Sequence, residues 1–181
     1  MLTTLKRAKS ALGIMEGDTE QDFSLQIALE AASNAIEREC NREFEVKTYT
    51  QRLDGSGTQF LRLRNFPIQT VSEVREAGKV IADDSYEIEG ENGMLFKRYC
   101  WPYGTRNIKV EYTAGYVLPS DVAGAAESTL PRNYELACIL FAQTLMQTPG
   151  VTSERVGDIS VTYASAASGV LPSAVAALIK L

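Results

Sequence analysis

The sequence contains no histidine, and this absence narrows the possible functions more than any other feature. Without histidine there is no Ser–His or Cys–His nucleophile pair, and the commonest general base and metal ligand are both missing. The three cysteines (Cys40, Cys100 and Cys138) are an odd number without CxxC spacing. They indicate neither a disulfide framework nor a zinc site, and we expect no metal and no cofactor. A reducing, cytoplasmic site of synthesis fits best.

Positive charge and long apolar runs are also scarce. The chain has 18 lysines and arginines and 23 aspartates and glutamates, which gives a net charge of −5 and an isoelectric point of about 4.9. Such a chain is a poor candidate for binding a phosphate backbone, although its acidic surface is compatible with DNA passing nearby. The basic clusters at 6–9 and 62–64 are short and are interpreted as surface charge. No stretch is long and apolar enough for a membrane span, and the N-terminus does not resemble a signal peptide.

The most regular stretch is residues 18–44, where the periodicity predicts a helix of about six turns. Asp18 is a suitable N-cap, and Gln21 stands where a capping box would close. The predicted buried stripe repeats at three- and four-residue steps and consists of Phe23, Ile27, Ala31, Ala35 and Ile36. A shorter helix before it, capped by Thr3 or Thr4 and ended by Gly13, has Lys6, Arg7 and Lys9 on its solvated side.

After Phe44 the period changes to two, and residues 45–116 predict an inserted antiparallel β block. Residues 54–57 (DGSG) are interpreted as a hairpin turn, and Glu91-Asn92-Gly93 as another. A helix follows Pro131, with an apolar stripe from Tyr134 through Phe141 to Leu145. Beyond it we expect a polar loop at 151–158, a strand at 159–163, a small-residue linker at 164–169 and a C-terminal helix. The fold class is α+β: a small helical bundle with an inserted β block.

These elements suggest four segments within one structural domain. They are an N-terminal helix pair (1–44), the β block (45–116), a helix completing the bundle (117–150) and a strand with a C-terminal docking segment (151–181).

Two patterns in the sequence are candidate chemical sites. Gly55-x-Gly57 resembles part of a phosphate loop, but a strand rather than a helix follows it, which favours a turn. Clustered carboxylates are typical of acid–base work or of a hard-cation site, and here they are Asp83, Asp84, Glu87, Glu89 and Glu91. A solvated sheet face is the simpler interpretation. A small-ligand binding module or a carboxylate-based enzyme that uses this face, with Tyr86 beside it, is the alternative function.

Two other regions are candidates for protein contact. The loop around Trp101 and Tyr103 is the most aromatic part of the chain, and it is either folded on its own aromatics or a contact loop. The C-terminal helix either folds back on its own core or docks on a partner, and docking is favoured slightly. Its apolar residues are Leu171, Val175, Leu178, Ile179 and Leu181.

The order of these elements resembles the head–tail connector (adaptor, or head-completion) family of tailed bacteriophages and prophages. The resemblance rests on LTTLKRAKSALGI, IALEAASNAIEREC with NREF, and DGSGTQFLRLRNFPIQTVSEV. It continues through YEIEGENGMLF, the Trp-bearing loop, IKVEYTAGY, SERVGDISVTYAS and LPSAVAALI.

The resemblance implies a non-enzymatic structural protein of the virion, located at the head–tail interface and made in the bacterial host cytoplasm. Such proteins form a ring, typically of twelve copies, between the portal protein and the stopper or tail-completion proteins. The ring extends the DNA channel without sequence-specific binding. By this analogy the C-terminal residues Leu171, Val175, Leu178 and Ile179 are docking contacts. Gly55, Ser56, Gly57 and the loop of Trp101 and Tyr103 are contact tips of the β block.

Overall fold

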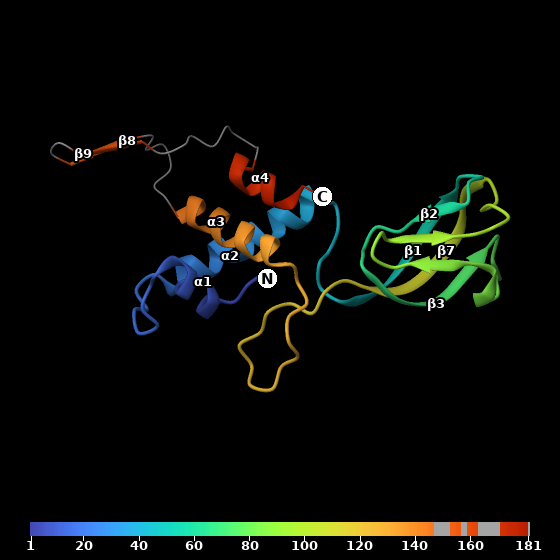
Figure 1. Ribbon diagram of the computed structural model, residues 1–181, viewed down its shortest axis with the longest axis horizontal. Coiled ribbons are helices and arrows are strands. Elements are labelled where there is room, and N and C mark those ends of the chain that lie inside the picture. Colours follow the sequence, from blue (N-terminus) through green and yellow to red (C-terminus); the bar gives the residue numbers. More distant parts are fainter. Residues whose placement is uncertain (147–152, 157–158, 163–170, 181) are drawn as a thin grey trace. The chain divides into compact units, whose positions relative to one another are not determined.

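The computed structural model describes residues 1–146, 153–156, 159–162 and 171–180, and the chain forms two compact units (Figure 1). Unit 1 comprises Met1–Cys40 and Pro119–Leu181, and unit 2 comprises Asn41–Leu118. The α-helices and a two-stranded sheet lie in unit 1, and the two larger antiparallel sheets lie in unit 2, so the predicted α+β class with an inserted β block is confirmed.

The helices of unit 1 are α1 (Leu5–Leu12), α2 (Asp22–Glu39), α3 (Arg132–Met146) and α4 (Ser173–Ile179). The predicted ends of α1 are confirmed. The Thr4 hydroxyl accepts a hydrogen bond from the Arg7 amide, and Gly13 takes the left-handed conformation with φ of 73°.

The predicted start of α2 is wrong, and Lys9 explains why. Asp18 lies in a loop that precedes the helix rather than at its cap. The Lys9 ammonium is buried and donates to the carbonyl oxygens of Glu16 and Asp18 at 3.2 and 2.5 Å. It also donates to the Asp22 carboxylate at 2.7 Å. Lys9 was predicted to be solvated, but it holds this loop against α1 by satisfying three acceptors at once.

The predicted buried stripe of α2 is correct at Ile36, which is fully buried, but wrong at Phe23 and Ile27. The side chains that α2 buries are Leu25, Ala28, Leu29, Ala32, Ser33 and Ile36. Phe23 and Ile27 lie outside this buried set and are 77% and 51% exposed. Both rows repeat at helical spacing, so the sequence offered two apolar faces. Helix α2 packs against α3, and the row that contains Leu25 and Leu29 is the buried one.

Helix α3 begins directly after Pro131 and buries Tyr134, Ala137, Cys138, Ile139 and Ala142 together with Glu135. Leu145, placed in the predicted stripe, is 46% exposed. The Cys138 sulfur lies 3.3 Å from the Ser33 hydroxyl oxygen of α2, and burial raises the pKa of this thiol. Helix α4 packs on α3, where the Asn133 side-chain amide donates to the Leu178 carbonyl at 2.7 Å.

Unit 2 contains two sheets. The four-stranded sheet has the order β1 (Lys47–Gly55), β7 (Gly104–Ala114), β3 (Ile68–Glu76) and β4 (Lys79–Val80). The three-stranded sheet has the order β2 (Phe60–Arg62), β6 (Met94–Phe96) and β5 (Glu87–Glu89), and the short 3-10 helix η1 (Asp83–Ser85) precedes β5. The predicted turn at residues 91–93 is confirmed, because β5 and β6 pair across it.

The predicted DGSG hairpin is wrong, because β1 and β2 belong to different sheets. Gly55 ends β1 opposite Gly104 of β7, and its amide donates to the Asn107 side-chain oxygen at 2.8 Å. A Cβ at Gly55 would come within 1.7 Å of the Pro102 carbonyl oxygen, so no other residue fits there. The glycine serves this close approach while the chain crosses from one sheet to the other.

A single apolar core fills unit 2, and Trp101 is its largest side chain. The indole N–H of Trp101 lies 3.2 Å from the Gln59 carbonyl oxygen and 3.3 Å from that of Leu95. The aromatic loop is therefore folded onto the core at Trp101. The core residues are Leu61, Leu63, Ile68, Val74, Tyr86, Leu95, Trp101, Ile108, Val110, Tyr112 and Ala114.

Near the C-terminus, β8 (Ser153–Val156) pairs antiparallel with β9 (Ile159–Thr162). The strand predicted from Ile159 is confirmed over these residues, but the predicted polar loop contains β8. The sequence SERV has too few apolar residues to show a strand by alternation alone. The predicted linker at residues 164–169 lies outside the described residues.

Candidate interaction surfaces

The helices of unit 1 leave an apolar groove exposed. It encloses about 600 Å³ between α2 and α3 and is lined by Gln21, Ser24, Ile27, Ala28, Ala31, Leu145 and Met146. Phe23 is exposed on the same helix. Large apolar side chains grouped on one surface are typical of a protein contact. We call these residues, with Phe23, the apolar groove.

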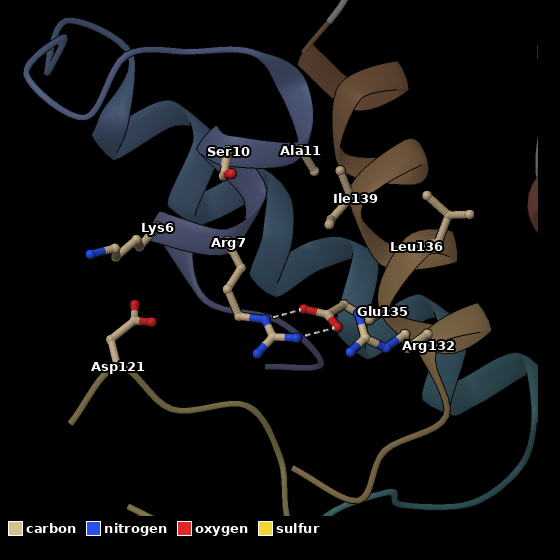
Figure 2. Close-up of a pocket in the computed structure, with 9 residues that line it drawn as sticks. All are labelled: Lys6, Arg7, Ser10, Ala11, Asp121, Arg132, Glu135, Leu136 and Ile139. Carbon is tan, nitrogen blue, oxygen red and sulfur yellow. Dashed lines mark hydrogen bonds and ion pairs between the residues drawn. The ribbon is translucent and has the colours of Figure 1, made fainter. Parts of the chain in front are cut away.

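A second hollow of about 500 Å³ lies between α1 and α3 (Figure 2). Arg7 of α1 and Glu135 of α3 meet there in a bidentate pair, with nitrogen–oxygen distances of 2.6 and 2.8 Å. The Thr3 hydroxyl also donates to Glu135 at 3.0 Å, and the bond to Glu135 raises the pKa of Arg7. Because both carboxylate oxygens accept hydrogen bonds, Glu135 is occupied as a structural acceptor and is badly placed to act as a general base.

The predicted C-terminal contact residues divide into two groups. Val175 and Ile179 are buried in unit 1, where α4 packs on α3. The preferred interpretation, that they reach out to a partner, is not met for these two side chains, because α3 offers them an apolar surface within the same unit. Leu171 and Leu178 are half-buried, and Leu181 lies outside the described residues.

The predicted tips of unit 2 also divide. Tyr103 is 89% exposed, and a Cβ built on Gly57 would lie 3.9 Å from the Tyr103 Cβ, so these two residues are neighbours. Ser56 is exposed beside them, with its hydroxyl 2.7 Å from that of Thr58. Trp101 and Gly55 are buried, and the expectation that they form part of an exposed tip is not met. The surface at this end is therefore Ser56, Gly57 and Tyr103.

The clustered carboxylates lie on η1, on β5 and in the turn after β5. We call Asp83, Asp84, Glu87, Glu89 and Glu91 the acidic segment. The Tyr86 hydroxyl donates to Asp83 at 3.3 Å, and burial together with this carboxylate raises the pKa of Tyr86 to about 12. The apolar groove and the Arg7 hollow are lined by other residues, so these carboxylates line neither cavity.

The structure brings together a basic cluster that sequence reasoning missed. Arg52 of β1 and Arg75 of β3 both lie directly opposite Lys109 of the central strand β7. Together with Arg106 they line a hollow of about 390 Å³ on the four-stranded sheet. We call Arg52, Lys109 and Arg75 the basic row. Each arginine is isolated in sequence, and only the strand register aligns them.

Within residues 1–146 and the described parts beyond, no three acidic, cysteine or histidine side chains gather where they could hold a metal ion. No helix in the described part of the chain has the length and apolarity to span a bilayer.

Comparisons with known proteins give one family and a set of solved structures. No curated protein sequence matches the chain. One similar structure, described as the neck of an empty GTA particle computed with C6 symmetry, superposes with a TM-score of 0.60 and 20% identity. That match covers 97% of this chain and 86% of the other.

Two further structures have the same fold. The virion of a native gene transfer agent (GTA) particle matches with a TM-score of 0.57 and 20% identity, over 97% of this chain and 86% of the other. The neck of a native GTA particle computed with C12 symmetry matches with a TM-score of 0.55 and 19% identity, over 86% and 79%. The model of the family described as "Head completion protein" matches residues 1–181, and the chain therefore belongs to the head completion protein family.

Proposed function

We propose that this protein is a non-enzymatic structural component of the virion neck, where twelve copies form a ring at the head–tail interface. The ring joins the portal protein to the stopper or tail-completion proteins and extends the DNA channel. Membership of the head completion family supports this role, as does the shared fold with chains in neck structures computed with C6 and C12 symmetry.

The apolar groove is the structural observation that best supports ring formation. A single copy leaves Phe23, Ile27 and Leu145 exposed to water on the helical unit. At about 25 cal/mol per Å² of buried apolar surface, covering such side chains is a substantial driving force for association. Around a closed ring the same groove on every subunit is covered by a neighbouring copy.

The remaining exposed candidates are assigned to partners above and below the ring. Ser56, Gly57 and Tyr103 form a tip suited to a downstream contact, because exposed tyrosine is enriched at contact hot spots. For α4, docking on the portal uses the side that faces away from α3, with Leu171 and Leu178 at its margin. Val175 and Ile179 then hold the helix to α3 rather than touching the portal.

The test is an Ile27→Asp variant with Asn34→Asp as its control. Both changes place a new aspartate on an exposed position of α2, but only Ile27 lines the groove. Each purified protein is mixed with DNA-filled heads that carry a portal and lack this component. Co-sedimentation and electron microscopy then report binding at the portal vertex.

We expect wild type and Asn34→Asp to add a ring at one vertex, and Ile27→Asp to remain folded by circular dichroism but fail to do so. Normal ring formation by Ile27→Asp would remove the role of the groove. Failure of the folded wild-type protein to bind would contradict the connector function itself.

A further inference from the structure

The basic row places three like charges side by side across neighbouring strands. Arg52 and Lys109 are directly paired across β1 and β7, and Lys109 and Arg75 across β7 and β3. Like charges directly opposite each other destabilise an antiparallel sheet. An acidic chain that nevertheless aligns three cations, with a fourth at Arg106 beside them, has concentrated positive potential at one place.

Two of these four positive charges are neutralised by carboxylates of unit 2, and the other two have no ion-pair partner among the described residues. Glu73 accepts two hydrogen bonds from Arg75 at 2.5 and 2.8 Å, and Glu111 accepts one from Lys109 at 2.5 Å. No ion pair within the described residues involves the side chains of Arg52 or Arg106, and both are exposed. Two guanidinium groups at the edge of the hollow are therefore available to an anion.

The neighbouring acidic residues favour a carboxylate over a nucleic acid. Glu111 and Glu73 are paired with each other one step along the same sheet face, directly beside the basic row. A phosphate backbone running across this face would meet these two carboxylates, whereas a single side-chain carboxylate enters the hollow without crossing them. The planar fork of arginine also matches a carboxylate in a bidentate arrangement.

The chain itself carries the complementary charge in the acidic segment. Its five carboxylates have no ion pair among the described residues, and they are carried by η1, β5 and the turn beyond β5. β5 is an edge strand of the three-stranded sheet, whereas the basic row lies on the four-stranded sheet. Unit 2 as a whole has eleven basic and eleven acidic residues, so the two patches are opposite charges on a neutral unit.

We infer that the basic row and Arg106 of one copy bind the acidic segment of a second copy. The inference rests on the proposed ring and names a contact within it. Two different patches on each subunit make a head-to-tail contact, which closes into a ring when the rotation between copies permits. The charged contact selects the correct neighbour and register, while the apolar groove of unit 1 supplies burial.

Charge reversal and exchange test this contact. One variant combines Arg52→Glu with Arg106→Glu, a second combines Glu87→Lys with Glu89→Lys, and a third carries all four changes. The matched control is Arg62→Glu with Arg64→Glu, which changes the charge of unit 2 equally at exposed positions outside the hollow. Copies of each variant per particle are measured by quantitative mass spectrometry in particles produced without the wild-type chain.

We expect each two-site reversal to lower the copy number per particle about tenfold, because like charges then face each other across the contact. The four-site variant should regain most of the wild-type level, and the control should match wild type. Normal incorporation of the two-site reversals would overturn the contact while leaving the ring intact. Absence of the wild-type chain from the neck would instead overturn the proposed function.

Failure of the four-site exchange to restore incorporation also overturns the inference, provided that circular dichroism shows a folded protein. Where a reversal unfolds the chain, the neutral pair Arg52→Gln and Arg106→Gln replaces it, with a smaller loss expected. Purified wild type is also titrated with duplex DNA. Salt-dependent binding abolished by Arg52→Glu with Arg106→Glu would assign the basic row to nucleic acid and contradict the protein contact.

Discussion

Arg7 and Glu135 join the first and third helices of unit 1 through two parallel hydrogen bonds of 2.6 and 2.8 Å. Glu135 is buried and also accepts from Thr3, so one carboxylate ties the N-terminal segment, α1 and α3 together. Arg7 and Glu135 are 128 positions apart in sequence. The pair therefore connects the two chain segments of unit 1 that the inserted β block separates in the sequence.

Replacing Glu135 with Gln should destabilise unit 1 by about 2 kcal/mol, because a charge-assisted bidentate pair loses one acceptor and Arg7 loses its countercharge. Thermal unfolding followed by circular dichroism at 222 nm measures the change. The control is Lys6→Ala, which removes an exposed ion pair between α1 and Glu16 of the following loop and should leave the melting temperature almost unchanged, because solvent screens this pair. Equal effects from the two variants would contradict the closing role of Glu135.

Replacing Lys9 with Met should cost about 3 kcal/mol, since the Glu16 and Asp18 carbonyls and the Asp22 carboxylate all lose their shared donor. The methionine side chain keeps most of the volume, so lost hydrogen bonding rather than a cavity is measured. Limited proteolysis should also cut the loop before α2 faster in this variant. Unchanged proteolysis of that loop would argue against Lys9 as its anchor.

Trp101→Ala and Tyr103→Ala should differ sharply although the two residues are neighbours in sequence. Trp101 is fully buried in the core of unit 2, and its truncation should destabilise that unit by about 4 kcal/mol. Tyr103 is exposed, so its truncation should leave unfolding unchanged and weaken only partner binding. Denaturant unfolding measures the free energy of unfolding of both variants. A Trp101→Ala protein as stable as wild type would show that the Trp101 side chain does not contribute to the core.

Tyr86 predicts a loss of stability at alkaline pH. Its pKa is raised to about 12, chiefly by burial and secondly by Asp83, whereas an exposed tyrosine ionises near pH 10. Above about pH 10 the unfolded chain therefore releases a proton that the folded chain retains, and stability falls as the pH rises toward 12.

In Tyr86→Phe this decline should be smaller, although buried Tyr112, whose pKa is also raised by burial, keeps part of it. Melting temperatures at about pH 9 and pH 11 measure the difference. The exposed Tyr103→Phe serves as the control and should retain the full wild-type decline. A Tyr86→Phe protein that declines as steeply as wild type would contradict the assignment.

Local patterns were sufficient to predict the class of fold and the caps of α1, because helical spacing, Thr4, Gly13 and the change of period at residue 45 act over a few residues. They did not determine which face of α2 is buried. Phe23 with Ile27 and Leu25 with Leu29 have the same spacing, and only the presence of α3 distinguishes them. Three residues of the stripe predicted as core, Phe23, Ile27 and Ala31, belong to the apolar groove instead.

Features that depend on distant partners were beyond sequence reasoning. Lys9 was predicted to be solvated, but the loop carbonyls fold over it. For the loop of Trp101 the sequence left packing on its own aromatics and protein contact open, and Trp101 is enclosed by the core of unit 2. The basic row depends on the register of three strands that are separated in sequence, so no window of the chain contains it.

Two cysteines of the chain differ in their accessibility to a thiol reagent, and this difference can report the opening of unit 1. Cys100 is exposed in unit 2, whereas Cys138 is buried between α2 and α3, with its thiol held protonated beside Ser33. A maleimide reagent at neutral pH therefore labels Cys100 rapidly and reaches Cys138 only when these two helices separate. In a Cys40→Ala background, the rate of the slow modification reports the opening of unit 1, with the fast one as an internal standard.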